Sequence, residues 1–199
     1  MVSSKFKKMF EEKVASSVAP LVSLGLTPNT LTVMGLAASG AAAWCYLNWS
    51  SNPLLLPAAA TLVLLSGLLD ALDGVLARKT GKASAFGGFF DSVADRYSDA
   101  VVLAAITVSG LCHPVWGMAA LIGSMMVSYA RARAEAAGVS MAAVGLAERA
   151  ERMILLIAVS YGAYFRLELL GYGVILLALI SNLTVLQRAA HFYEETKKR

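Results

Sequence analysis

Six apolar segments dominate the sequence and limit the folds that the chain can adopt. They are separated by prolines, turn residues or charges and lie at about residues 29–49, 54–78, 83–111, 115–134, 146–164 and 169–191. Crossing a bilayer as a helix takes roughly 20 mainly apolar residues. Only 15% of the 199 residues are charged, against about 25% in a typical soluble domain. The sequence therefore predicts an all-α polytopic membrane protein with six transmembrane helices, and a very hydrophobic soluble helical bundle is the alternative.

The segment that precedes the first span has a different pattern. Residues 2–23 mix lysines with spaced, large apolar side chains. There is no long apolar core and no clear cleavage site, so the pattern indicates an amphipathic interfacial helix and not a secretory signal. No repeat, linker or second domain is visible, and residues 1–199 are expected to form a single membrane domain. Cys45 and Cys112 are too few for a disulfide framework or a cysteine-based metal site.

The cations predict how the six spans are oriented. The N-terminus, the loops after the second and fourth spans and the C-terminus share one side, and every lysine and arginine except Arg166 falls there. By the positive-inside rule this side is cytoplasmic. We therefore expect a multi-pass protein of the cytoplasmic membrane with both termini and the active site on the cytoplasmic side. Membrane topology also accounts for the net charge of +4, so nucleic acid is not expected as a partner.

Acidic residues gather on the same side, where the second span ends and the third begins. Asp70 and Asp73 are three residues apart, and Asp91 and Asp95 are four apart, so each pair lies on one face of its helix. Carboxylates at membrane depth are costly and are functional candidates by default. Without Cys or His they favour hard cations, and four of them could hold two metals that clamp phosphoryl oxygens. The alternative is that these acids only pair with nearby cations, and Asp99 is expected to support the site or pair helices.

The aspartates belong to a longer pattern. Eight fixed positions have compatible spacing, namely Asp70-x2-Asp73-Gly74-x2-Ala77-Arg78-x8-Gly87-x3-Asp91-x3-Asp95. This pattern resembles the signature of the CDP-alcohol phosphatidyltransferases. Residues 26–32, LTPNTLT, are similar to the start of that family's first transmembrane helix. Six spans and an N-terminal interfacial helix also fit, so the resemblance covers nearly the whole chain.

The resemblance implies both a reaction and a set of site residues. The family uses the hydroxyl of an alcohol to displace CMP from a CDP-linked lipid, which forms a phosphodiester. The implied ligands of two Mg²⁺ or Mn²⁺ ions are Asp70, Asp73, Asp91 and Asp95, and Asp95 is also the implied catalytic general base. The resemblance suggests a homodimer, although no surface for it is evident. The implied CDP-lipid-binding residues are Asn29, Thr30, Leu31, Thr32, Asp70, Asp73, Gly74, Ala77, Arg78, Ser84 and Gly87.

Arginines on the cytoplasmic side indicate which alcohol is accepted. The ends of three spans carry Arg131, Arg133, Arg149, Arg152 and Arg188. Arginine makes bidentate contacts with phosphate, so this set favours an anionic acceptor over free inositol. The segments SYARARAE and ERAER also resemble the inositol-phosphate branch of the family, which makes 1L-myo-inositol 1-phosphate the leading prediction. The alternative is that these arginines are ordinary positive-inside residues paired with nearby glutamates.

Other functions stay open at this point. Glycerol 3-phosphate or its enantiomer is the second acceptor, and serine is the third. A divalent-cation channel or transporter would also use four aspartates, but it would not explain why they lie at one membrane face beside arginines. Apolar spans do not distinguish a diacyl lipid donor from an ether-linked isoprenoid donor, since both need only an apolar groove.

Overall fold

The computed structural model describes residues 25–198, and these residues confirm the all-α class. Within that range there is no strand. The expected interfacial helix at residues 2–23 lies outside the described residues. The elements are α2 (Pro28–Leu47), the 3-10 turn η1 (Trp49–Ser51), α3 (Leu55–Thr80), α4 (Ala85–Val108), α5 (Pro114–Ala136), α6 (Arg149–Ala163) and α7 (Glu168–Lys197).

Local sequence signals explain where the helices around the aspartates begin and end. Thr27 caps α2 by accepting from the Thr30 N–H, and Pro28 follows at the first helical position. Gly81 ends α3 with a φ of 65°, a conformation that glycine adopts without steric cost. Ser84 then caps α4 by accepting from the Gly87 N–H at 3.0 Å. The connection between α3 and α4 is therefore only four residues long, 81–84.

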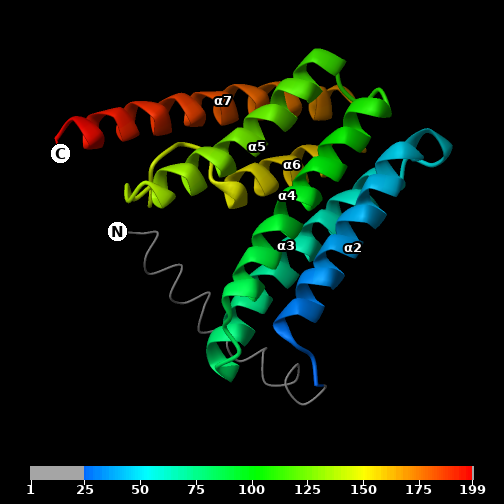
Figure 1. Cartoon of the computed structure of the whole chain (residues 1–199). Helices are drawn as coiled ribbons and strands as arrows, with labels where there is room; N and C mark the ends of the chain where they lie inside the picture. The colour runs from blue at the N-terminus through cyan, green and yellow to red at the C-terminus, as the bar shows by residue number, and fades with distance from the viewer. Residues whose placement is uncertain (1–24, 199) are drawn as a thin grey trace.

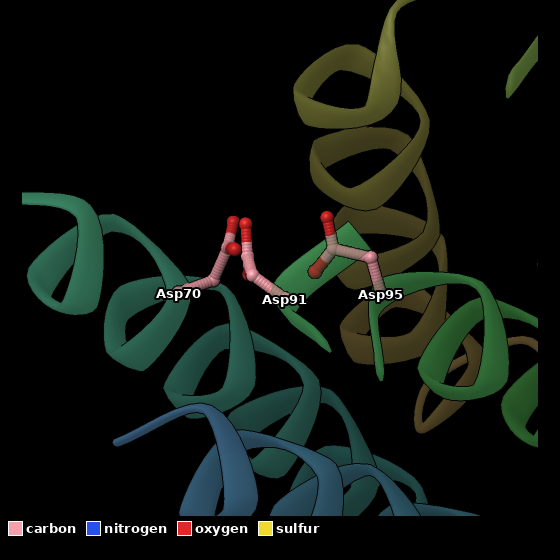
Figure 2. A group of neighbouring side chains, drawn as sticks. All are labelled: Asp70, Asp91 and Asp95. Carbon is pink, nitrogen blue, oxygen red and sulfur yellow. The ribbon is translucent and has the colours of Figure 1, made fainter. Parts of the chain in front are cut away.

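Helix α2 packs against both α3 and α4, which run beside it in Figure 1. The short connection predicts that α3 and α4 are direct neighbours, but their backbones make few close contacts with each other. Their aspartates instead meet across a gap between the two helices (Figure 2). The remaining helices form a second group, in which α7 packs on α5 and α6. Contacts of α6 with α3 and of α5 with α4 join the two groups.

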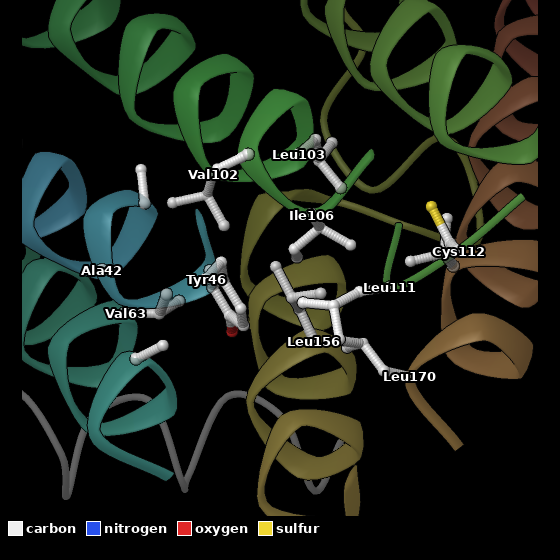
Figure 3. Packing of buried hydrophobic residues seen from close by; sticks show 14 of the residues in the cluster. Ala42, Tyr46, Val63, Val102, Leu103, Ile106, Leu111, Cys112, Leu156 and Leu170 are labelled. Atoms are coloured by element: carbon white, nitrogen blue, oxygen red, sulfur yellow. The ribbon is translucent and has the colours of Figure 1, made fainter. Parts of the chain in front are cut away.

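The main hydrophobic core lies away from the aspartates. Figure 3 shows Val63 of α3 and Ile106 of α4 packed around Tyr46 of α2, together with Leu156 of α6. The Tyr46 hydroxyl lies 2.6 Å from the Ser160 hydroxyl, which joins α2 to α6 through a buried hydrogen bond. The core thus uses the first half of α3 and the second half of α4. The opposite halves of these two helices carry the aspartates, and there the second half of α3 packs Leu69 and Leu76 against Leu31 of α2.

Three described helices, α2, α3 and α7, are long and apolar enough to cross a membrane. Leu64 and Leu68 on α3 and Leu179, Leu183 and Leu186 on α7 expose at least 41% of their surface, as expected of side chains that face lipid. Helix α4 carries four charged residues, and the 15 residues of α6 span about 22 Å, less than the roughly 30 Å hydrocarbon core. Six transmembrane helices therefore stay a prediction.

The predicted boundaries differ from the structure by up to three residues at most helices and by six at the end of the last one. The fifth span was expected from about residue 146, but the chain stays non-helical through 137–148 and α6 begins at Arg149. Positive φ values at Gly138, Ala143 and Gly145 keep this loop out of helical geometry. The sixth span was expected to end near residue 191, but α7 continues through the charged tail to Lys197.

Candidate active site

Three aspartates from two helices form a compact cluster of carboxylates. Asp70 of α3 and Asp91 and Asp95 of α4 offer oxygens that all lie within 4.8 Å of one another (Figure 2). The Oδ1 atom of Asp91 is buried and has no hydrogen-bond partner within residues 25–198. Such a buried atom is costly unless something binds it. An oxygen-only donor set with one unpaired buried oxygen fits a hard divalent cation such as Mg²⁺ or Mn²⁺.

Asp73, the fourth predicted ligand, lies beside this cluster and has a different partner. It is buried, and its Oδ2 accepts a 2.6 Å hydrogen bond from the Thr32 hydroxyl of α2. Asp73 still lines the same small pocket as the other three aspartates. The structure thus brings together all four carboxylates that the sequence singled out, and it adds a neutral donor from α2 that fixes the orientation of one of them.

Arg149, at the start of α6, lies among the aspartates. Its Nη1 is 2.8 Å from Asp70 Oδ2 and 2.8 Å from Asp95 Oδ1. Its Nε is 3.3 Å from Asp99 Oδ1. The sequence interpretation placed Arg149 with the acceptor and did not anticipate these ion pairs. No local pattern links residues 79 positions apart, so only the tertiary fold reveals that this guanidinium balances part of the cluster's negative charge.

A pocket of about 580 Å³, open to solvent, adjoins the aspartates on one side. Eight of the eleven residues predicted to bind the CDP-lipid line it: Asn29, Thr32, Asp73, Gly74, Ala77, Arg78, Ser84 and Gly87. Lys82, from the connection between α3 and α4, also lines the pocket. The sequence interpretation missed Lys82, although its position between Arg78 and Ser84 was a usable signal.

The three other predicted CDP-lipid residues do not line this pocket. Asp70 belongs to the carboxylate cluster. Leu31 is buried against Leu69 and Leu76, and Thr30 is exposed with its hydroxyl 2.8 Å from that of Thr27. Helical periodicity explains this result, because positions three apart share a face while the two positions between them turn away. Asn29 and Thr32 can therefore face the pocket together only if residues 30 and 31 do not.

Gly87 shows why the pocket wall needs a small residue. A Cβ at this position would lie 3.1 Å from the Ser84 hydroxyl and 3.5 Å from Oδ1 of Asn29. Glycine thus lets the first turn of α4 come close to the first turn of α2. A larger side chain would push the cap of α4 away from the pocket.

A second pocket, of about 470 Å³, adjoins the aspartates on the other side. Its lining includes five arginines, Arg96, Arg131, Arg149, Arg152 and Arg188. The other lining residues are the acids Asp95 and Glu148 and the smaller residues Val127 and Ser128. Four of the five predicted acceptor arginines are thus brought together. Arg133 is exposed on α5 and is not part of this wall. Arg96 and Glu148 were not predicted as wall residues.

Arg188 and Arg131 are held in opposite ways at this pocket. Arg188 is buried, and it donates from Nε to the Val144 carbonyl at 3.0 Å and from Nη1 to the Val127 carbonyl at 2.6 Å. These bonds fix the plane of its guanidinium. Arg131 is about half exposed and pairs with Glu135 at 2.9 Å, which agrees with the interpretation of ordinary positive-inside residues paired with glutamates.

The two large pockets meet at the carboxylates. The small pocket around the four aspartates shares Thr32, Asp73 and Asp91 with the first large pocket. It shares Asp95 and Arg149 with the second. A ligand in either large pocket therefore borders the aspartates, and two ligands bound together would approach each other there.

Comparisons with known proteins show which family the chain resembles over most of its length. Residues 25–186 match the model of the CDP-alcohol phosphatidyltransferase family. The archaetidylinositol phosphate synthase of Pyrococcus horikoshii is 41% identical over 196 residues, which are 98% of this chain and 97% of that protein. The phosphatidylinositol phosphate synthase of Mycobacteroides abscessus is 35% identical over 189 residues, which cover 84% of this chain and 78% of that protein.

Solved structures share the fold. The crystal structure of Mycobacterium tuberculosis phosphatidylinositol phosphate synthase in complex with manganese and citrate matches with a TM-score of 0.80 and 30% identity, covering 90% of this chain and 88% of that chain. The structure of the same enzyme with CDP-DAG bound matches with a TM-score of 0.79 and 30% identity, covering 90% of this chain and 93% of that chain.

Proposed function

The chain belongs to the CDP-alcohol phosphatidyltransferase family, and on that premise we propose that its acceptor is 1L-myo-inositol 1-phosphate. Transfer from a CDP-linked lipid would release CMP and give an inositol-phosphate phospholipid. The family makes the protein a membrane-embedded transferase of phospholipid biosynthesis. The observation that carries the proposed acceptor is the arginine-lined pocket, because it borders Asp95 on the side away from the predicted CDP pocket.

The donor is assigned to the pocket that Asn29, Gly74 and Ser84 line. Arg78 and Lys82 supply positive charge there for a diphosphate, and the absence of a Cβ at Gly74 lets a ligand approach the backbone of α3. Support comes from the Mycobacterium tuberculosis enzyme, whose structure with CDP-DAG bound has the same fold. The lipid tails would remain in the bilayer beside the exposed apolar faces of the helices.

Divalent metal is assigned to the aspartates. Asp70, Asp91 and Asp95 offer converging oxygens, and Asp73 lines the same pocket. We propose that these four carboxylates hold two Mg²⁺ or Mn²⁺ ions, and the manganese complex of the Mycobacterium tuberculosis enzyme supports a divalent cation. When bound, such ions would neutralise the diphosphate and stabilise the departing CMP.

Asp95 is assigned as the general base because it lies where the acceptor pocket meets the carboxylate cluster. Its carboxylate lines the acceptor pocket as well as the carboxylate pocket. The acceptor hydroxyl would give its proton to Asp95 while its oxygen forms a bond to the lipid-bearing phosphorus. The bond from that phosphorus to the oxygen of CMP breaks in the same displacement. Arg131, Arg149, Arg152 and Arg188 would hold the acceptor phosphate, and Arg133 would not, because it is outside the pocket.

The same proposal extends to topology and assembly. We propose six transmembrane helices in a single domain over residues 1–199, with both termini and the active site at the cytoplasmic face. The charged ends of α3, α4, α5 and α7 and the start of α6 surround one group of pockets, which supports a common membrane face for them. We also propose a homodimer, on the resemblance to the family alone.

Two alternatives are distinguished by the acceptor. Glycerol phosphate is also an anion and would use the same arginines, whereas serine carries no phosphate and would leave them unused. Family membership assigns a transferase, so the divalent-cation channel or transporter considered from the sequence is set aside.

The test is CMP release by the purified full-length protein in detergent with Mg²⁺ or Mn²⁺. CDP-diacylglycerol and CDP-archaeol serve as donors, and the acceptors are inositol 1-phosphate, both glycerol phosphate enantiomers, serine and free inositol. We expect turnover with inositol 1-phosphate, loss of turnover in EDTA, and no turnover by Asp95→Asn. Efficient transfer to serine or free inositol, with none to inositol 1-phosphate, would refute the proposed acceptor. Full activity of Asp95→Asn would refute the assignment of the base.

A further inference from the structure

We propose that Asp99 is a positioning residue that sets the affinity for the anionic acceptor by holding the guanidinium groups of Arg149 and Arg152. The inference rests on the proposed function, since it gives Asp99 a part in binding a phosphate that it does not touch. Asp99 lies outside the eight-position pattern around the other aspartates, and it is not a member of the carboxylate cluster.

Asp99 reaches both arginines with separate oxygens. Its Oδ1 accepts from Nε of Arg149 at 3.3 Å, and its Oδ2 accepts from Nη2 of Arg152 at 3.1 Å. Only 13% of the Asp99 side chain and 4% of the Arg152 side chain are exposed. Hydrogen bonds between ionised groups in such surroundings are stronger than those between neutral groups. One carboxylate of α4 therefore fixes two guanidinium groups of α6.

The position of Asp99 shows that it acts from behind the pocket wall. It does not line the acceptor pocket, whereas Arg149 and Arg152 do. It lines instead a different pocket, which both arginines also border. The acceptor would meet the guanidinium groups on one side while Asp99 holds them on the other.

Arg149 needs this second anchor because other carboxylates compete for it. Its Nη1 lies 2.8 Å from both Asp70 and Asp95, and these contacts draw it toward the carboxylate cluster. The bond from Nε to Asp99 fixes the opposite edge of the planar group. Within residues 25–198, Nη2 of Arg149 has no hydrogen-bond partner, so this nitrogen is free to donate to a phosphate.

Arg152 depends on Asp99 for its charge balance. Its partners within the described part of the chain are Asp99 and the Ala147 carbonyl, which accepts from Nη1 at 3.1 Å. Removing one partner of a buried ion pair leaves the other charge uncompensated, which is strongly unfavourable. Without the Asp99 carboxylate, Arg152 would reorient. Neither Arg149 nor Arg152 would then be held in position in the wall of the acceptor pocket.

The experiment measures KM and kcat of the full-length enzyme and of Asp99→Asn with the anionic acceptor that the wild type uses. We expect the acceptor KM to rise about tenfold or more, since charge-assisted bonds to two phosphate-binding groups are lost. The KM for the CDP-lipid should change by less than about twofold, because neither Asp99 nor its two arginine partners line the CDP pocket. Glu151→Gln is the matched control, because it removes one negative charge from an exposed site of α6, the helix that carries both arginines.

Further variants keep the proposal testable if Asp99→Asn fails to fold. Asp99→Glu retains the charge but displaces it by one methylene, and it should give an intermediate acceptor KM. The double variant Asp99→Asn/Arg152→Gln should raise the acceptor KM by less than the product of the single effects, since both changes remove one interaction.

The outcomes separate this inference from the proposed function. If the wild-type enzyme uses another anionic acceptor, the proposed acceptor, inositol 1-phosphate, is refuted. The comparison of KM values with that other acceptor would still test the positioning role of Asp99. An unchanged acceptor KM in Asp99→Asn, or equal increases in both KM values, would overturn the positioning role. Lower thermal stability without a selective rise in the acceptor KM would also overturn it, because that result indicates helix pairing alone.

Discussion

Asp91→Asn is predicted to stabilise the protein in the presence of EDTA while it abolishes the response to metal. Asp91 carries a buried oxygen without a partner and lies within 4.8 Å of oxygens on Asp70 and Asp95. Two unit charges at that distance repel by about 3.5 kcal/mol at an effective dielectric constant of about 20. Arg149 balances Asp70 and Asp95 but forms no ion pair with Asp91, so Asp91 is the least compensated member of the cluster.

The expected gain in the free energy of unfolding is smaller than the repulsion energy of the two pairs that Asp91 forms with Asp70 and Asp95. Solvent screens the partly exposed cluster, and the distant attraction of Arg149 offsets part of the repulsion. We expect a rise of about 1–3 kcal/mol in the free energy of unfolding, because an amide at this position also donates hydrogen bonds to its neighbours. For a chain of this length, 1 kcal/mol corresponds to about 2–4 °C in the unfolding midpoint. The midpoint in EDTA should therefore rise by several degrees.

The assay is thermal unfolding in detergent, followed by the fluorescence of Trp44, Trp49 and Trp116 with EDTA or with Mn²⁺. Manganese at about 100 times its Kd should stabilise the wild type by about 2.7 kcal/mol, and most of this gain should be lost in Asp91→Asn. Asp99→Asn is a control of opposite sign, because Asp99 is paired with two arginines and its loss should lower the midpoint. A lower midpoint for Asp91→Asn in EDTA, or a full shift with Mn²⁺, would refute the reasoning.

Three further variants, two of them with a matched control variant, test the two pockets and the loop between α5 and α6. Thr32→Val removes the buried 2.6 Å hydrogen bond to Asp73 and should cost about 1–3 kcal/mol of stability. It should raise the KM of the CDP-lipid but not that of the acceptor, and equal effects on both KM values would contradict the pocket assignment. Arg188→Gln should raise the acceptor KM about tenfold or more, whereas Arg133→Gln, outside the pocket, should change it less than about twofold. Similar effects of both variants on the acceptor KM would contradict the assignment of the acceptor to this pocket. Gly145→Ala should lower the unfolding midpoint and raise the acceptor KM, because the residue has a φ of +113° and its Cβ would overlap the Thr184 side chain of α7. Gly110→Ala, with a φ of +75° and open space around it, should cost only about 1–2 kcal/mol, and an equal loss in both variants would contradict the steric argument.

Local patterns were sufficient to predict the helices and the carboxylate site. Prolines, turn residues, charges and apolar segments act over a few positions, so the helix order and most ends followed from the sequence to within a few residues. The i, i+4 spacing of Asp91 and Asp95 placed both on one face of α4, where the structure has them. For Asp70 and Asp73 the same rule was too coarse. A separation of three residues turns the side chain by about 60° around the axis, which directs Asp73 toward Thr32 of α2 and leaves Asp70 with the cluster.

The packing around the site was not predictable from the same patterns. A short connection indicates that two helices follow one another closely, but it does not fix the distance between them along their length. Helices α3 and α4 are joined by four residues and yet have few close backbone contacts with each other, because α2 packs against both. Two pockets border the aspartates in this region, and the length of the connection alone did not predict them.

The arginines show most clearly where reasoning from sequence ends. The positive-inside rule assigns all of them to one side and treats them alike, although their helical positions differ. Arg131 and Arg133 are two residues apart and so point about 160° away from each other around α5, and only Arg131 faces the pocket. Arg149 and Arg152 share a face of α6, but their common partner, Asp99, lies at least 50 positions earlier in the chain. The number of arginines on one side can therefore predict an anionic ligand. Which arginines bind it depends on Asp99, and a count of charges does not show that Asp99 holds two of them in place.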